Sequence, residues 1–353
     1  MDKRSNYLSL IRRTGYEKVP IDFSMCPSLN QKFNDYLKMN NIDLDIGWAH
    51  TSVSDLQPAQ ISIDNFHDFY DYKLKDGVYI DIWGIAHEPG SEAAHHMTRM
   101  RHPMAPFDSV QQVSEYPFPD YSKSSRLNQA REVEDSIKNG YATVGIMQIT
   151  IWETSWYLRG MENLMADMMS DDPIAEAILD KVTEIAVLRA EAFAKSGVDV
   201  IFLGDDIGMQ KTILMSESLY CEQLKPRLKK VIDAAKKIRP DILIFYHSCG
   251  FVTPFIPHLI DAGIDVLNPI QPECMDFREI HALFGDKISF HGTIGTQTTM
   301  PFGTPDDVRR AVFENLEIAG DKGGLLVAPT HLLEPEVPIE NIISYIKACA
   351  DFK

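Results

Sequence analysis

The chain has 353 residues, 44% of them hydrophobic, and its 34 basic and 51 acidic residues leave a net charge of −17 at pH 7. That charge repels a phosphate backbone, so nucleic-acid binding is not expected. No run of apolar residues is long enough to span a membrane and no signal-peptide pattern occurs, and the five cysteines are an odd number, so we expect free thiols and a cytoplasmic location.

The first half of the chain predicts three strands and two helices. The strands, of which the first two are weak, are Val19–Phe23, Val78–Trp83 and Thr143–Thr150. The helices are Gly160–Met169 and Pro173–Ser196. The stretch 86–138 is rich in turn signals and is expected to form an N-terminal loop and helix elaboration on the main fold.

The second half of the chain alternates short apolar strands with longer helical patterns. The expected strands are Val198–Leu203, Ile242–Tyr246, Ile264–Leu267, Lys287–Phe290 and Gly324–Val327. The expected helices are Leu219–Ile238, Thr253–Ala262, Asp276–Phe284, Pro305–Ala319 and Pro338–Ala350. Such alternation predicts a parallel sheet covered by helices. Eight strands favour an α/β fold of the (β/α)8 TIM-barrel type, formed as a single domain over residues 1–353, with a doubly wound open sheet as the alternative.

Polar side chains follow five successive predicted strands, where a parallel barrel places its active site. In chain order they are Asp205 and Asp206, His247 and Cys249, Asn268 and Gln271, His291, and His331. A barrel with such strand ends is more often an enzyme than a scaffold.

The pair His247 and Cys249 is the most specific of these features. Two residues apart at a strand end, with Gly250 allowing the turn, they place an imidazole and a thiolate on the same side of the backbone. Zinc takes nitrogen and sulfur ligands and needs a third ligand from elsewhere, for which His331 is the candidate. The alternative is a hydrogen-bonded histidine beside a packed thiol, which an isolated pair of this kind more often is.

Asp205 and Asp206 are adjacent, so their side chains diverge. One can face the barrel mouth as a general base or metal ligand, while the other caps the following segment. A capping role for both is equally compatible with the sequence.

Further substrate-binding candidates lie around the expected barrel mouth. Glu153, Trp156 and Tyr157 follow the strand at Thr143–Thr150, and Gln271 and His291 follow later strands. Aromatic residues in such places are more often packing than recognition. None of the sequence signatures of Rossmann dehydrogenases, P-loop enzymes, zincins or α/β-hydrolases occurs.

The chain resembles the uroporphyrinogen decarboxylase superfamily, which includes the corrinoid-dependent methyltransferases. The resemblance runs through most of the chain and rests on seven segments, 83–85, 156–162, 205–206, 246–250, 265–272, 301–305 and 335–341. It implies a (β/α)8 barrel.

The decarboxylase and methyltransferase branches of that superfamily differ in their active-site residues. True decarboxylases carry an arginine-rich segment after the first strand, where this chain has residues 22–27 without arginine. Asp81 falls where that branch has its pyrrole-binding aspartate, and His331 where it has an active-site histidine; Trp156 or Tyr157 stands at its tyrosine. The methyltransferase branch binds zinc through His-x-Cys and a later cysteine, at whose position this chain has His331.

The resemblance therefore implies a zinc-dependent methyltransferase that moves a methyl group between a small methylated substrate and a corrinoid on a partner protein, or a thiol. In it His247, Cys249 and His331 would bind Zn²⁺, and Asp205 or Asp206 would handle the proton. A homodimer is a family-level expectation. The alternatives are a metal-independent decarboxylase acting through Asp81 and His331, and a non-catalytic corrinoid- or tetrapyrrole-binding protein.

Overall fold

A seven-stranded parallel sheet forms the centre of the computed structural model, which describes residues 1–44, 46, 48–59, 63–90, 98–122, 124 and 127–352. Its strand order is β1–β5–β6–β7–β8–β9–β10. The strands are β1 His50–Val53, β5 Ala142–Gln148, β6 Val200–Gly204, β7 Leu243–His247, β8 Val266–Asn268, β9 Ser289–His291 and β10 Leu325–Leu326. Six of them match predicted strands, which confirms the α/β fold with a parallel sheet.

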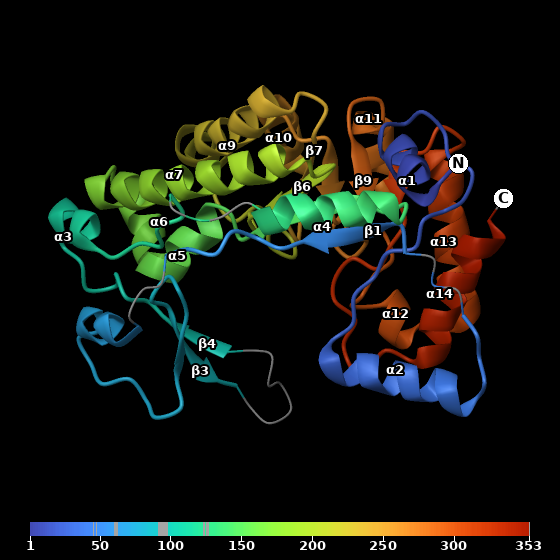
Figure 1. Cartoon of the computed structure of the whole chain (residues 1–353), viewed down its shortest axis with the longest axis horizontal. Helices are drawn as coiled ribbons and strands as arrows, with labels where there is room; N and C mark the ends of the chain where they lie inside the picture. The colour runs from blue at the N-terminus through green and yellow to red at the C-terminus, as the bar shows by residue number, and fades with distance from the viewer. Residues whose placement is uncertain are drawn as a thin grey trace.

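Helices connect and cover these strands. They are α1 Lys3–Ile11, α2 Pro27–Met39, α3 Val110–Glu115, α4 Leu127–Lys138, α5 Trp152–Arg159, α6 Met161–Met169, α7 Pro173–Ser196, α8 Glu217–Leu219, α9 Lys225–Ile238, α10 Ile256–Ala262, α11 Phe277–Phe284, α12 Thr299–Phe302, α13 Pro305–Ala319 and α14 Ile339–Asp351. Figure 1 shows α7 and α9 side by side along the sheet and α13 beside α14 at its other end. No helix in the described part of the chain is long and apolar enough to cross a membrane.

The predicted strand Val19–Phe23 is present only as isolated parallel bridges. Ile21 pairs with Trp48 just before β1, and Met25 pairs with Leu333 after β10. The Tyr345 hydroxyl on α14 lies 3.0 Å from the carbonyl oxygens of both Asp22 and Val327. The N-terminal segment therefore lies between the two edges of the sheet, without a continuous eighth strand among the residues described.

The prediction that Val78–Trp83 is a strand of the main sheet is wrong. Its short strand β2 (Tyr79–Ile80) joins β3 (Ala86–Pro89) and β4 (Thr98–Arg101) in a separate antiparallel sheet. Tyr79 is exposed and Ile80 is buried, an alternation typical of half-solvated antiparallel strands. Figure 1 shows β3 and β4 projecting away from the central sheet.

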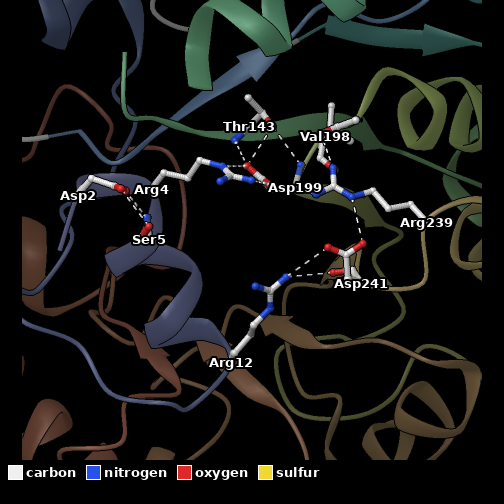
Figure 2. A network of polar contacts seen from close by, with 10 residues as sticks. Asp2, Arg4, Ser5, Arg12, Thr143, Val198, Asp199, Arg239 and Asp241 are labelled. Atoms are coloured by element: carbon white, nitrogen blue, oxygen red, sulfur yellow. Dashed lines mark hydrogen bonds and ion pairs between the residues drawn. The ribbon is translucent and has the colours of Figure 1, made fainter. Parts of the chain in front are cut away.

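A buried aspartate ties the amino end of the sheet together (Figure 2). Asp199 directly precedes β6, and its carboxylate accepts hydrogen bonds from Arg4 of α1 at 2.9 and 2.6 Å. It also accepts from the backbone N–H of Thr143 at 3.1 Å and from Arg239, which ends α9, at 3.4 Å. This network lies at the amino ends of the strands, opposite the strand ends that were predicted to carry the site.

Candidate metal centre and adjoining cavity

The carboxyl ends of β6 and β7 meet at a glycine. Gly204 pairs with His247 across the two strands, and a Cβ on Gly204 would lie 2.7 Å from the Cβ of His247, so only glycine allows this approach. Gly250 has φ +86°, a left-handed conformation that suits glycine, which agrees with its expected role in the turn after Cys249. Together these glycines fix where the His247 and Cys249 side chains begin.

Asp206, His247 and Cys249 form a compact group of possible metal ligands. One donor atom of each lies within 4.8 Å of the others. His247 Nε2 is 3.5 Å from both Asp206 Oδ1 and Cys249 Sγ. Asp206 Oδ1 also accepts the backbone N–H of Cys249 at 2.7 Å. The structure therefore brings the predicted pair together with one of the two predicted aspartates.

The chemistry of this group fits a cation. Burial, and after it the charges of Asp206 and Glu153, raises the pKa of the Cys249 thiol. Burial also lowers the pKa of His247, despite the nearby Asp206 carboxylate. The protein alone therefore favours a neutral imidazole and a neutral thiol. A bound metal ion would lower the pKa of the thiol and so favour the thiolate. Nitrogen, sulfur and carboxylate oxygen are the ligands that zinc takes in proteins.

His331, the predicted third ligand, lies close by but outside this group. Its ring centroid is 6.4 Å from that of His247, and its side chain is exposed. Both histidines line the same cavity. His331 thus lies near His247 at the cavity but is not part of the compact donor group, and its role as a ligand stays a prediction.

A buried chain of hydrogen bonds fixes which nitrogen of His247 can bind a metal. The Asp22 carboxylate only accepts, so His291 Nε2–H donates to it, at 2.9 Å. His291 Nδ1 then accepts from the Asn268 side-chain amide, which turns the Asn268 oxygen toward His247 Nδ1 at 2.6 Å. His247 therefore carries its proton on Nδ1, and its Nε2 lone pair faces Asp206 and Cys249.

We expect Asn268→Leu to weaken zinc binding by about 10- to 100-fold, because it removes the bond that orients a ligand histidine. A competition titration with a chromophoric chelator measures this. The control is Asn139→Leu, an exposed asparagine whose amide donates to the Asp135 carbonyl, and it should leave the affinity unchanged. An unaltered affinity in Asn268→Leu would show that the chain of hydrogen bonds does not support the ligand.

A cavity of about 380 Å³ lies on the inner face of the sheet, and His247 is the member of the metal-ligand group that lines it. Alternate residues of two strands point into it, as the period of a strand requires. Its lining consists of Tyr7, Asp22, Phe23, Ser24, His50, Val144, Ile146, Gln148, Phe202, Phe245, His247, Asn268, His291, Pro329, Thr330, His331 and Leu332. Ile146 is 38% exposed in the middle of β5, which shows that the inner face is not filled by side chains.

Asp22 and His50 lie in this cavity, and the sequence interpretation assigned a role to neither. His50 Nε2 is 3.2 Å from Asp22 Oδ2. Burial opposes the charge on Asp22, but His50 and His291 outweigh it and hold the pKa of Asp22 well below its usual value. Burial likewise opposes the charge on His50, yet Asp22 raises its pKa. The two groups form an ion pair inside the fold.

Glu153, Trp156 and Tyr157 lie on α5, outside the cavity lining. The backbone N–H of Asp206 donates to Glu153 Oε2 at 3.2 Å, and the Tyr157 hydroxyl donates to Glu153 Oε1 at 3.0 Å. Burial, followed by the charges of Asp205 and Asp206, raises the pKa of Glu153 to about 8. Glu153 therefore holds a proton at neutral pH.

Asp205 and Asp206 diverge as expected of neighbours. Asp205 is buried and accepts the backbone N–H groups of Ile151 and Glu153 at the start of α5, whereas Asp206 faces the metal-ligand group. Burial raises the pKa of Asp205 to about 7, although those N–H groups favour its charged form. Asp205 thus positions α5, and Asp206 is the aspartate available for chemistry.

A protein-family model for uroporphyrinogen decarboxylase (URO-D) matches residues 77–352. The chain belongs to this family. Among curated relatives, the methylcobamide:CoM methyltransferase MtaA of Methanosarcina barkeri is 26% identical over 192 residues, 54% of this chain and 53% of the relative. A uroporphyrinogen decarboxylase of Coxiella burnetii is 22% identical over 182 residues, 51% of this chain and 48% of the relative.

The chain spans about half the length of the curated relatives it matches. Among solved structures, a methyltransferase from Methanosarcina mazei aligns with a TM-score of 0.69 at 18% identity, covering 100% of this chain and 99% of that one. At that identity the likeness shows a shared fold.

Two further predicted residues of this uroporphyrinogen decarboxylase family member, Asp81 and Gln271, also lie outside the cavity lining. Asp81 lies in the turn after β2, where it accepts the N–H groups of Trp83 and Ile85 and lies 3.1 Å from His87 Nε2. Gln271 accepts the N–H of Gly250 at 3.1 Å and so holds the turn that follows Cys249. The described contacts of both residues are with the protein itself.

Proposed function

We propose that the chain is a zinc-dependent methyltransferase that transfers a methyl group between a small substrate and a corrinoid cofactor on a partner protein, or a thiol. The observation that carries the proposal is the group of Asp206, His247 and Cys249 at the ends of β6 and β7. The M. barkeri relative, named a methylcobamide:CoM methyltransferase, supports the same class of reaction.

In this proposal His247 Nε2, Cys249 Sγ and Asp206 Oδ1 would hold the metal, with His331, which lines the same cavity as His247, as a further ligand. Zinc supplies a Lewis acid that lowers the pKa of a substrate heteroatom. Asn268 keeps the His247 lone pair directed at the site. Glu153 accepts the backbone N–H of Asp206 from outside the cavity lining and so helps to hold that residue in place.

The test is the zinc content of the purified protein compared with that of a His247→Ala/Cys249→Ala double variant. We expect about one zinc per chain in the wild type and little in the variant. Demethylation of methylcobalamin with a thiol acceptor should follow the zinc content. Equal and negligible zinc in both proteins would refute the proposal.

We expect Asp206→Ala to weaken zinc binding by about 10-fold or more, and by more than His331→Ala does, because Asp206 already lies within the compact donor group. Both variants are titrated against the same chelator. A loss confined to His331→Ala would identify His331 as the third ligand and Asp206 as a neighbour of the site.

The decarboxylase alternative has less support from the structure. Asp81 is engaged in the turn after β2, away from the cavity lining. The described residues that line the cavity include no lysine or arginine to pair with several substrate carboxylates. At about 380 Å³ the cavity is also near the small end of the roughly 300–1,000 Å³ range of ligand pockets.

The remaining expectations belong to the same proposal. The bridges at Ile21 and Met25 favour an eighth position that closes a (β/α)8 barrel. The corrinoid-carrying partner would then dock at the mouth, where His331 is exposed. A single domain, a cytoplasmic location and a homodimer stay predictions.

A further inference from the structure

The inner face of the sheet surrounds a hollow where packing alone would place side chains. The interiors of eight-stranded parallel barrels are normally filled by layers of branched side chains. Here Val144, Ile146, Phe202 and Phe245 form apolar walls, and the Phe202 and Phe245 ring centroids are 5.2 Å apart. An unfilled interior with apolar walls is the usual form of a small-molecule site.

One polar side chain in this hollow lacks hydrogen-bonding partners. Neither ring nitrogen of His50 makes a hydrogen bond with the described residues, and both atoms are buried. Asp22 lies 3.2 Å from Nε2 as an ion partner, which leaves Nδ1 with no contact of either kind. Because buried polar atoms in folded proteins almost always have a hydrogen-bond partner, His50 points to a ligand atom within its reach.

The charges around the hollow favour an uncharged ligand. Asp22 is ionised and His50 is the cation of its ion pair. Both ring nitrogens of His291 are engaged within the protein, one by Asp22 and one by the Asn268 amide. These charges cancel, and the lining within the described ranges offers no lysine or arginine. A charged ligand would lose its hydration without gaining an unpaired opposite charge.

We propose that the hollow binds a small uncharged molecule with an apolar body and one hydrogen-bonding end, such as a hydroxyl, which contacts His50. His50 and Asp22 line the same cavity as His247 and His331. A ligand held by His50 can therefore extend toward the metal-ligand group. Resting on the proposed function, this molecule is the substrate class of the methyl transfer, with its reacting heteroatom at the metal.

The test uses three ligands of similar shape and different charge: benzyl alcohol, benzoate and benzylamine. Their binding to metal-depleted protein is measured by calorimetry at about pH 7.5, where the latter two are ionised. We expect benzyl alcohol to bind with a Kd about tenfold or more below those of the two ions. Absent binding of benzyl alcohol, or equal binding of an ion, would overturn the proposal.

Two variants locate the site. Ile146→Trp should abolish binding by filling the hollow, whereas Ile137→Trp, at an isoleucine of similar exposure on α4 (37% against 38%), should not. His50→Leu should weaken binding by about tenfold or more. Circular dichroism verifies that each variant is folded. Undiminished binding in Ile146→Trp would place the site elsewhere and refute the proposal, even if His50→Leu does not fold.

Because these measurements use protein without metal, they separate the two proposals. Loss of zinc binding with retained benzyl alcohol binding would contradict the proposed methyl transfer and leave the hollow's ligand class standing. Zinc-dependent methyl transfer without binding of benzyl alcohol would support the proposed methyl transfer and contradict the ligand class proposed for the hollow.

Discussion

Replacing Cys249 with alanine is expected to lower the rate of methyl transfer by about 1,000-fold or more, since a catalytic zinc contributes several kcal/mol to the transition state. The thiol is one of three donors within 4.8 Å of each other, and no other donor of that group can substitute for it. Turnover of methylcobalamin with a thiol acceptor, and zinc content on the same samples, provide the measurement.

Cys221→Ala is the matched control for this substitution. Cys221 Sγ also lies near a histidine, 3.4 Å from His258 Nδ1, but this pair is not part of a three-donor group among the residues described. The control should retain both zinc and activity. If Cys249→Ala kept wild-type turnover, the metal-ligand group would not be the site of the reaction.

Asp199→Ala should reduce the free energy of unfolding by about 3–5 kcal/mol, because it leaves two arginines near the sheet without their shared partner. The Asp199 side chain is 1% exposed and joins Arg4 to Arg239 across the amino ends of the strands. Figure 2 shows both guanidinium groups directed at this carboxylate. Chemical denaturation followed by circular dichroism measures the change.

Asp241→Ala supplies the comparison within the same network. Asp241 also pairs with Arg239, at 3.2 Å, but its side chain is 64% exposed. Exposed pairs contribute about 1 kcal/mol or less, so this variant should be nearly as stable as the wild type. Equal losses in the two variants would mean that burial does not set the strength of the network.

The elements predicted best are those with a clear periodic pattern and clear end signals in the sequence. The α7 helix has the predicted bounds, Pro173–Ser196, because Asp172 caps its start and Gly197, in a left-handed conformation, ends it. The β1 strand was missed, since its sequence His-Thr-Ser-Val has one apolar residue. It belongs to the sheet through pairing with β5, a long-range contact that a local pattern does not contain.

In the site too, the contact between residues close in sequence was predicted, and several contacts between residues far apart in sequence were not. His247 and Cys249 share one strand end, so their spacing alone predicted that they would meet. Asp22 and His50 meet only because the N-terminal segment folds between the edges of the sheet. The role of Asn268 depends on His247 and His291, which come from different strands and hydrogen-bond to its side chain. Asp81 was assigned by resemblance, and its turn places it elsewhere.

If His247 binds zinc as proposed, the hydrogen-bond chain from Asp22 to His247 makes the state of this ligand depend on the N-terminal segment being in place. Its first member, Asp22, lies on the N-terminal segment between β1 and the end of β10, and its last member is a proposed ligand. A chain whose N-terminal segment has not docked lacks the Asp22 carboxylate at this position. Without that acceptor, nothing fixes which ring nitrogens of His291 and His247 carry a proton. In such a chain the Nδ1–H form of His247 would no longer be enforced, so the proposed zinc site would be fully preorganised only in folded molecules.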